Sequence, residues 1–277
     1  MTDTTAPLGP QRGKLTPDVT VPRYALSHRA KSWAIWVIIF GLLVWSWSPA
    51  EMFRAASLVT DWRNMAEFGQ AFLSPNFREW ESYLIDMVVT IQIAIWGTAL
   101  AVVFGIPVSI LCSSNVAPQW IVQPVRRLMD ACRAINEIVF ALLFVVAVGL
   151  GPFAGVMALF VHNLGIFAKL FSEAVEAVDP RPVEGIRVTG AVRVQEVIFG
   201  VIPQVMPMWS SLTLYRLETN VRSATTLGIV GAGGIGQTLY ESIRSFHYAE
   251  TAAQIIIVVL TVMLLDMLSS RIRATLV

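Results

Sequence analysis

Hydrophobic residues along this chain are gathered in six long runs that polar connections separate. A helix needs about 20 apolar residues to cross a bilayer, or somewhat fewer where Trp or Tyr anchors its ends. The first run has Trp at both ends, and the second contains a Gly-Ile-Pro sequence near its end, which indicates a break. The pattern predicts six transmembrane helices, at about 33–47, 84–111, 134–150, 153–171, 201–221 and 252–268.

Lys and Arg are distributed unequally between the two sides of such an arrangement. Cytoplasmic loops of membrane proteins carry an excess of these residues. With the N-terminus inside, fourteen Lys and Arg residues fall in cytoplasmic segments and five in outer segments, while Arg216 falls within the fifth span. We therefore expect an all-α integral membrane protein with about six transmembrane helices and both termini in the cytoplasm.

Composition agrees with a chain surrounded by membrane lipid. Hydrophobic residues make up 55% of the sequence and charged residues 14%, whereas an average soluble domain carries about 25% charged residues. A net charge of +1 argues against a nucleic-acid partner, which requires a basic surface. The two Cys and three His residues lack ligand or pairing spacing, so we expect no disulfide framework and no metal site.

The first 32 residues are polar and rich in Pro and Thr. No small-residue cleavage site closely follows the apolar run that begins at Trp33, so the segment does not have the pattern of a cleaved signal peptide. We expect a cytosolic tail over 1–32. The next segment, 33–82, is expected to hold the first transmembrane helix and an external amphipathic stretch, which lies on the membrane surface or contacts another protein.

A Gly-x-Gly-x-x-Gly sequence is formed by Gly231, Gly233 and Gly236. Dinucleotide-binding turns have this spacing, but they require a parallel sheet. Here the glycines lie between two predicted membrane spans, with no residues left for a sheet. Two interpretations remain, and both can hold. The small residues allow close helix packing, or they form a broken backbone that lines a substrate path.

The predicted cytoplasmic connection at 173–207 has an amphipathic pattern. Asp179-Pro180 and Pro182 mark a turn followed by the start of a helix. Gly190 predicts two short helices joined at a bend. The apolar side holds Val183, Ile186, Val194, Val197 and Ile198, and the polar side holds Glu184, Arg187, Arg193 and Glu196. Taken alone, such a pattern is typical of a helix at a membrane surface.

Part of this connection also has the spacing of a known motif. Glu184, Gly190 and Pro203 fit the sequence E-A-A-x3-G-x9-I-x-L-P, and Ile202 stands in place of its leucine. The remaining motif positions differ, because they hold Gly185, Ile186 and Gly200. The connection therefore resembles the EAA loop of ABC importer permeases.

The resemblance extends over about residues 83–270 and is closest to the phosphonate-type permeases. These show runs similar to 136–155, 169–178 and 215–237. The resemblance implies a type I ABC importer permease fold over 83–270, with a coupling loop at about 173–205, and leaves 271–277 as a cytosolic C-terminal end. It also implies a location in the bacterial plasma (inner) membrane.

The same resemblance implies a set of partners. Two copies of the permease would form the pathway, two ATP-binding subunits would dock from the cytoplasm, and an extracytoplasmic binding protein would deliver the substrate. The chain has no GxxxxGK[ST] sequence, so ATP and Mg²⁺ would be bound by the partner subunit and this chain would be no enzyme. The coupling to the ATPase would be served by Glu184, Gly190, Ile202 and Pro203.

The fifth predicted span and its outer end carry four charged or amide side chains. Ionisable groups inside a membrane are costly and are therefore functional candidates. Arg forks and backbone N–H groups suit a phosphorus oxyanion, so we expect a substrate pathway that includes Arg216, Glu218, Asn220, Arg222, Gly231, Gly233 and Gly234. Positions 216 and 220 share one helix face, and positions 218 and 222 share another. The alternative is a structural Arg–Glu pair within or between protomers, since Glu218 can neutralise either Arg.

Two more charged groups lie near the ends of other spans. Arg133 and Glu137 are four residues apart and are expected to pair on one helix at the inner end of the third span. Asp86 begins the second span and is expected to be solvated. We interpret Arg133, Asn136 and Glu137 as gate or packing residues.

The favoured function is that of a permease subunit for phosphonate or a related phosphorus oxyanion, such as phosphate or phosphite. A permease of the same build for another small solute, such as methionine, is the alternative, but a zwitterion does not require an Arg-rich span. A membrane enzyme would need a His, carboxylate or nucleophile motif that is not found. A secondary transporter would typically show an internal repeat, which is also not found.

Overall fold

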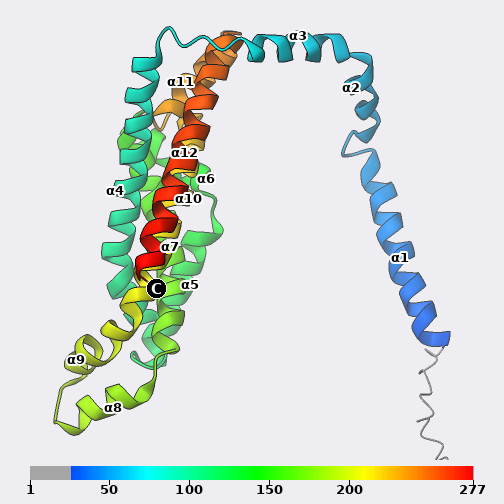
Figure 1. The fold of residues 1–277 in the computed structure, drawn as a ribbon. Coiled ribbons are helices and arrows are strands. Elements are labelled where there is room, and N and C mark those ends of the chain that lie inside the picture. Colours follow the sequence, from blue (N-terminus) through cyan, green and yellow to red (C-terminus); the bar gives the residue numbers. More distant parts are fainter. Residues whose placement is uncertain (1–25, 277) are drawn as a thin grey trace, which may run out of the picture. The chain divides into compact units, whose positions relative to one another are not determined.

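The computed structural model describes residues 26–276, and all regular structure in this range is helical (Figure 1). The chain forms two compact units, 1–63 and 64–277. The described part of the first unit holds α1 (Leu26–Trp47), a 3-10 turn (Met52–Ala56) and α2 (Ser57–Thr60), and α3 (Trp62–Leu73) begins at the boundary. The second unit holds α4 (Trp80–Cys112), α5 (Gln119–Ala134), α6 (Glu137–Val148), α7 (Pro152–Glu176), α8 (Pro180–Val188), α9 (Arg193–Gln195), a π-helical segment (Glu196–Val201), α10 (Ile202–Gly228), α11 (Ile235–Arg244) and α12 (Tyr248–Leu276).

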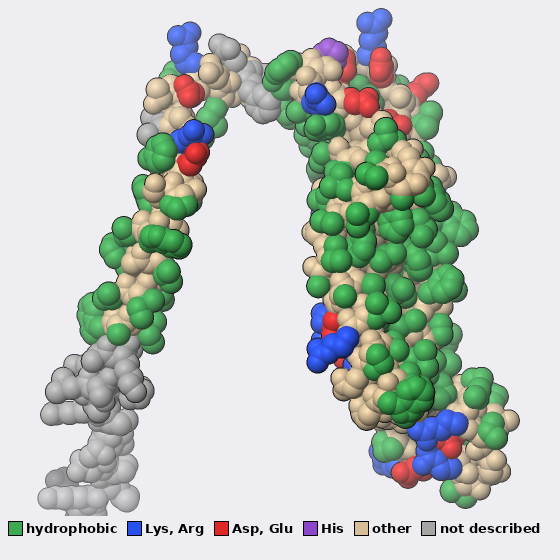
Figure 2. Space-filling model, turned by 180° about the vertical axis from the view of Figure 1, so that it is seen from behind, with side chains coloured by type: hydrophobic (Ala, Val, Ile, Leu, Met, Phe, Trp, Pro, Cys, Tyr) green, Lys and Arg blue, Asp and Glu red, His purple; other side chains and the backbone are tan. Residues whose placement is uncertain are grey.

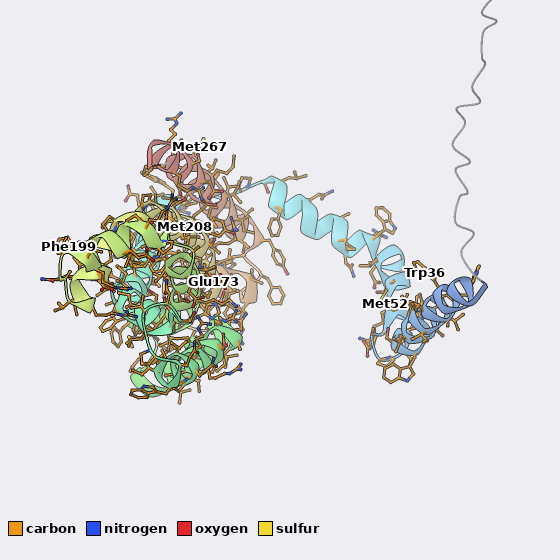
Figure 3. The ribbon with its side chains drawn as sticks, turned by 90° about the horizontal axis from the view of Figure 1, so that it is seen from below. Trp36, Met52, Glu173, Phe199, Met208 and Met267 are labelled. Atoms are coloured by element: carbon orange, nitrogen blue, oxygen red, sulfur yellow. The ribbon has the colours of Figure 1, made fainter. Side chains whose placement is uncertain are left out.

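Helix α1 is apolar on every side from Trp33 to Trp47, and the side chains of this stretch are exposed within their unit. Figure 3 shows Trp36 on this helix, with side chains projecting in several directions. A helix that is apolar all round belongs in lipid or in a protein core. The helix begins at Leu26, inside the predicted tail, and residues 1–25 of that tail lie outside the described residues.

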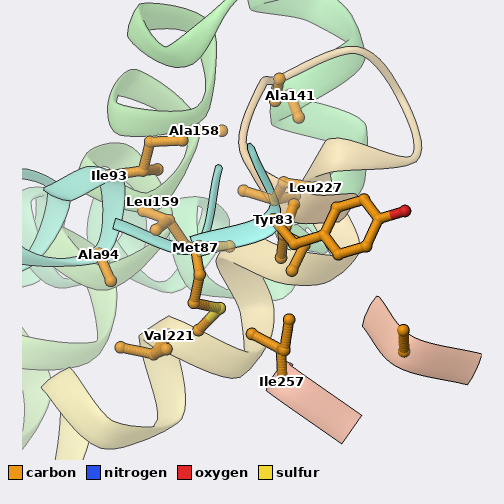
Figure 4. Close-up of a cluster of buried hydrophobic side chains, with 14 residues drawn as sticks. Tyr83, Met87, Ile93, Ala94, Ala141, Ala158, Leu159, Val221, Leu227 and Ile257 are labelled. Atoms are coloured by element: carbon orange, nitrogen blue, oxygen red, sulfur yellow. The ribbon is translucent and has the colours of Figure 1, made fainter. Parts of the chain in front are cut away.

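In the second unit, α4 and α7 pack closely along their lengths. A Cβ atom added at Gly97 of α4 would lie 2.7 Å from the Cβ of Leu159 on α7, which is closer than two side chains tolerate. Membrane helices commonly use small residues for such close contact. Tyr83 and Met87 continue the contact into a buried cluster with residues of α6, α7, α10, α11 and α12 (Figure 4).

The predicted break near the end of the second span is absent. Helix α4 continues through Pro107 to Cys112. Proline removes one backbone hydrogen bond from a helix, but α4 is held there by its packing, since a Cβ atom at Gly105 would lie 3.1 Å from the Cβ of Phe167. Tertiary contact therefore outweighs the local break signal.

A sharp break does occur between α5 and α6, whose axes differ by 89°. Ile135 is extended, and the side chain of Asn136 accepts a hydrogen bond of 2.9 Å from the backbone N–H of Ile138, which caps α6. The prediction that Arg133 and Glu137 pair on one helix is therefore wrong, because the helix is interrupted between them. Arg133 pairs instead with Asp130, at 2.8 Å. The extended residue and the cap that follows it are thus the local cause of the break.

Four helical segments are long and apolar enough to cross a membrane, within the part of the chain that the structure describes: α4, α7, Arg193–Gly228 and α12. The bent pair of α5 and α6 is a fifth candidate. The flanks of the second unit are largely hydrophobic, and charged side chains gather toward its two ends (Figure 2). The all-helical membrane architecture is confirmed, whereas the count of six spans and the cytoplasmic placement of the termini stay predictions.

Candidate functional site

The predicted coupling loop folds as a helical hairpin. Asp179 caps α8 by accepting a hydrogen bond of 3.0 Å from the backbone N–H of Arg181, and Pro180 occupies the first helical position. The Arg181 guanidinium also donates to Asp179 and lowers the pKa of that carboxyl. After α8 ends, Gly190 has a φ of +84°, and α9 follows. The prediction of two short helices joined at Gly190 is confirmed.

An internal ion pair braces this hairpin. The guanidinium of Arg187 donates two hydrogen bonds of 2.9 Å to the carboxylate of Glu196, and this fork raises the pKa of Arg187. The Glu196 side chain is only 8% exposed, so the prediction that it lies on the polar, solvent-facing side of the connection is wrong. The π-helical turn that begins at Glu196 brings its carboxylate back toward α8. We call the segment from Asp179 to Val201 the coupling hairpin.

Two further side chains tie the coupling hairpin to the bundle. Arg193 donates to the backbone carbonyls of Asn115 and Val116, in the connection between α4 and α5. Gln204 accepts from the backbone N–H of Asp179 at 3.2 Å and donates to the carbonyl of Gly200 at 2.6 Å. Gln204, which directly follows the matched proline, was not predicted as a contact.

The four predicted coupling residues have different surroundings. Glu184 is exposed and makes no hydrogen bond or ion pair within residues 26–276, but it lines a cavity of about 150 Å³ with Arg187 and Arg193. A Cβ atom at Gly190 would find open space. Ile202 and Pro203 form the first turn of α10. Glu184 and Gly190 are therefore available for contact with another protein.

Inside the bundle, polar side chains of three helices converge. Arg216 of α10 donates two hydrogen bonds, of 2.6 and 3.2 Å, to the side-chain oxygen of Asn163 on α7, which is completely buried. Ser223 of α10 donates to Glu137 of α6 at 3.0 Å, and His162 of α7 lies 3.5 Å from the same carboxylate. We call these five residues the inner polar cluster.

The predicted division of the fifth span into two faces is confirmed. Arg216 and Asn220 both turn inward, and Asn220 donates to the hydroxyl of Thr98 on α4 at 2.7 Å. Glu218 faces α12 and pairs with Arg273 at 3.2 Å. Arg222 is exposed. Glu218 is therefore paired with an Arg of another helix, rather than with either Arg of its own helix.

The glycine-rich turn between α10 and α11 has positive φ angles at Gly231, Gly233 and Gly234. It packs against the start of α7, where the N–H of Gly151 donates to the carbonyl of Gly231 at 3.0 Å. A Cβ atom at Gly233 would lie 2.9 Å from Pro152. The turn thus combines a broken backbone with close packing, which supports the packing interpretation and leaves the substrate path a prediction.

The helix that follows this turn, α11, was not predicted. Its first N–H, from Ile235, donates to Thr90 of α4 at 2.9 Å, and Thr238 donates to Asp86 at 2.6 Å. Asp86 is therefore partly buried and bonded, and the expectation that it is solvated is wrong. The apolar face of α11 is short, which explains why hydrophobic runs of membrane length did not reveal it.

The inner polar cluster was also missed as a group. Arg216 was predicted as a site residue, but His162 and Asn163 were not, although both are polar residues within the fourth apolar run. The rule that intramembrane polar groups are functional candidates would have identified them. The approach of His162 to Glu137 depends on the break before α6, which was not predicted.

Comparison with known proteins gives consistent matches. Residues 105–277 match the family described as binding-protein-dependent transport system inner membrane component. The phosphite transport system permease protein PtxC of Stutzerimonas stutzeri is 36% identical over 85% of this chain and 86% of its own length. A protein of Escherichia coli K12 named as a cryptic phosphonate transport system permease, PhnE1, is 52% identical over 51% of this chain and 70% of its own.

Two further matches extend this picture. The phosphate-import permease protein PhnE of Mycolicibacterium smegmatis is 40% identical over 68% of this chain and 36% of its own length. Among solved structures, an inward-facing methionine ABC transporter, MetNI, matches with a TM-score of 0.64 and 22% identity, over 72% of this chain and 99% of that one. At this level of identity, the structural match speaks for the fold alone.

Proposed function

The chain belongs to the family of inner membrane components of binding-protein-dependent transport systems, and from this premise we propose that it is a permease subunit that imports phosphonate or a related phosphorus oxyanion. It is a transport subunit of the inner membrane and no catalytic enzyme. The relatives named for phosphite, phosphonate and phosphate share the chemistry of a small tetrahedral phosphorus anion.

One observation carries the choice of an anionic cargo. Arg216 lies within a membrane-spanning helix and is half-buried, yet its hydrogen-bond partner is the neutral amide of Asn163. No carboxylate forms an ion pair with it in the described range 26–276. An intramembrane cation that no carboxylate bonds directly is costly, and the passing anion offsets that cost. Arg222, exposed at the outer end of the same helix, would attract the anion at the entrance.

The proposed pathway follows α10 outward from Arg216. Asn220 and the turn at Gly231, Gly233 and Gly234 continue it along the same helix and beyond its end. Positive φ angles turn successive backbone N–H groups in new directions, and such groups bind anions when they converge. Glu218 serves instead as a structural partner of Arg273, which holds α10 to α12.

The proposed partners are those of a type I importer. The exposed bend at Gly190 and the free carboxylate of Glu184 suit docking into an ATP-binding subunit on the cytoplasmic side. The brace from Arg187 to Glu196 would transmit movement of the hairpin to α10 as a rigid body. A second copy of this chain would complete the pathway, and an extracytoplasmic binding protein would deliver the cargo.

The experiment that tests this function is ATP-dependent uptake into vesicles that hold the permease, its ATP-binding subunit and its binding protein. Labelled phosphate is offered with and without excess methylphosphonate, and labelled methionine is offered separately. We expect uptake of phosphate that methylphosphonate blocks, and no uptake of methionine. Uptake of methionine alone, by an assembled complex that hydrolyses ATP, would leave the permease assignment and remove the phosphorus oxyanion.

A further inference from the structure

The inner polar cluster contains a carboxylate with hydrogen-bonding capacity left over. The Nδ1 atom of His162 lies 2.9 Å from the backbone carbonyl of Ile135. A carbonyl oxygen can only accept, so Nδ1 carries a hydrogen in this contact. The other ring nitrogen, Nε2, lies 3.5 Å from the carboxylate of Glu137, which is longer than a good hydrogen bond. One carboxylate oxygen of Glu137 is therefore open to a hydroxyl donor.

The cluster also has unused donors. Arg216 uses two of its five N–H groups on Asn163 and makes no other hydrogen bond within the described residues. Arg216 meets Asn163 and Glu137 meets His162, which are consecutive residues of α7. The cluster therefore holds N–H donors on α10 and a carboxylate acceptor on α6, both against the same turn of α7.

The cluster is also accessible. The side chain of Glu137 is 22% exposed and that of His162 is 14% exposed, while Asn163 beneath them is completely buried. Ser223 holds one oxygen of Glu137 in place at 3.0 Å and leaves the other toward His162. A ligand can thus approach Glu137 and His162 from their partly exposed side.

We propose that the inner polar cluster is an oxyanion site of the permease itself, and that it selects anions that carry a P–OH group. The inference rests on the proposed function and adds the chemical form of the cargo. The P–O⁻ oxygens would accept from Arg216, and the P–OH group would donate a hydrogen bond to Glu137. Glu137 is then the residue that determines specificity, because its carboxylate repels an anion that has no hydrogen to donate.

Two small anions distinguish recognition of a P–OH group from simple attraction of negative charge. At mildly acidic pH, methylphosphonate and methanesulfonate have the same charge and similar shape, but only methylphosphonate carries an acidic hydroxyl. A site that hydrogen-bonds a hydroxyl rejects the analogue that lacks it. We therefore expect methanesulfonate to compete at least about tenfold more weakly, a cautious figure for a partly exposed site.

The test measures equilibrium binding of labelled methylphosphonate to the permease in complex with its ATP-binding subunit in lipid nanodiscs, without the binding protein. Unlabelled methanesulfonate is the competitor. In Glu137→Gln, the amide can donate to a sulfonate, so the preference should fall to within about threefold while methylphosphonate still binds. The control variant Glu173→Gln, at an exposed carboxylate of α7 (Figure 3), should keep the wild-type preference.

Three outcomes would overturn the proposal. These are equal competition by both anions in the wild type, an unchanged preference in Glu137→Gln, and no binding by a wild-type complex that imports the anion from its binding protein. The last result leaves the proposed function intact and removes only the site. If Glu137→Gln fails to assemble, the comparison of the two anions on the wild type still decides.

Discussion

The coupling hairpin and the inner polar cluster use charged residues in opposite ways. In the hairpin, Arg187 and Glu196 satisfy each other with two hydrogen bonds of 2.9 Å. In the cluster, Arg216 bonds to a neutral amide, and Glu137 bonds to a hydroxyl and faces an imidazole. We call Arg187 and Glu196 a closed pair, because each bonds the other and the geometry is fixed. We call Arg216 an open charge, because no carboxylate bonds it and it remains available to a ligand.

The surroundings make this difference meaningful. An exposed ion pair contributes little to stability, because water competes for both partners. In the hairpin pair, however, the carboxylate of Glu196 is buried. Water therefore does not easily replace its two hydrogen bonds from Arg187, whose geometry is fixed. Arg216 is half-buried within a membrane-spanning helix, so the absence of a directly bonded carboxylate is costly unless a ligand or water compensates. The ion pair therefore stiffens the hairpin, whereas the cluster keeps hydrogen-bonding groups available to a ligand.

The strongest test of this comparison changes the open charge. Arg216→Gln removes a cation that makes charge-assisted hydrogen bonds, each worth about 1.5–3 kcal/mol, so uptake should fall by about 100-fold. Assembly with the ATP-binding subunit should be retained. Arg222→Gln, which changes an exposed Arg on the same helix, should reduce uptake by less than about tenfold because its charge is screened by water. Dissociation of the Arg216→Gln complex would favour a structural role instead.

The next test blocks the docking surface of the hairpin. Gly190→Trp places a large side chain on the exposed bend and should lower transport per ATP hydrolysed by about 30-fold, the effect of losing one strong interface contact. Gly190→Ala is the matched control, because it introduces the same backbone strain at φ +84° without the bulk. Normal transport in Gly190→Trp would contradict the coupling assignment. Glu184→Lys should act in the same direction as the Trp variant, since it reverses the charge of a free carboxylate.

Opening the closed pair should have a smaller effect. Arg187→Gln and Glu196→Gln each break the fork and should lower transport per ATP several-fold, while ATP hydrolysis continues. The exchange variant, Arg187→Glu with Glu196→Arg, should recover part of the loss because it restores the pair. The ratio of transport to hydrolysis in nanodiscs or vesicles measures both effects. Equal ratios in all variants would mean that the fork does not transmit movement.

The last test compares two backbone positions by their effect on stability. Gly190 and Gly233 both have positive φ, but only Gly233 is packed, since a Cβ atom added there would lie 2.9 Å from Pro152. Gly233→Ala should therefore destabilise the permease by about 1–3 kcal/mol more than Gly190→Ala, because overpacking adds to backbone strain. Thermal unfolding in detergent measures the difference. Equal unfolding temperatures would show that the glycine turn is as free as the hairpin bend.

Local features of the fold were predictable where all the residues that cause them lie in one short segment. Asp179 and Pro180 mark the start of α8 by capping chemistry, and Gly190 marks its end. The break at Ile135 was not predicted, because its cap, Asn136, was placed within the first residues of the third predicted span, 134–150. The break at Pro107 was predicted and is absent, because α7 supports the helix on that side.

The sequence by itself determined the membrane setting, the helical class and the position of the short helical hairpin at 179–201, since each follows from composition, periodicity or the capping and turn residues of one segment. The tertiary structure alone decided which charges are closed and which are open. Periodicity places Arg216 and Glu218 on different faces of α10, but it does not say which helix each face meets. That choice depends on side chains far apart in the sequence, Asn163 for Arg216 and Arg273 for Glu218, and on the way their helices pack.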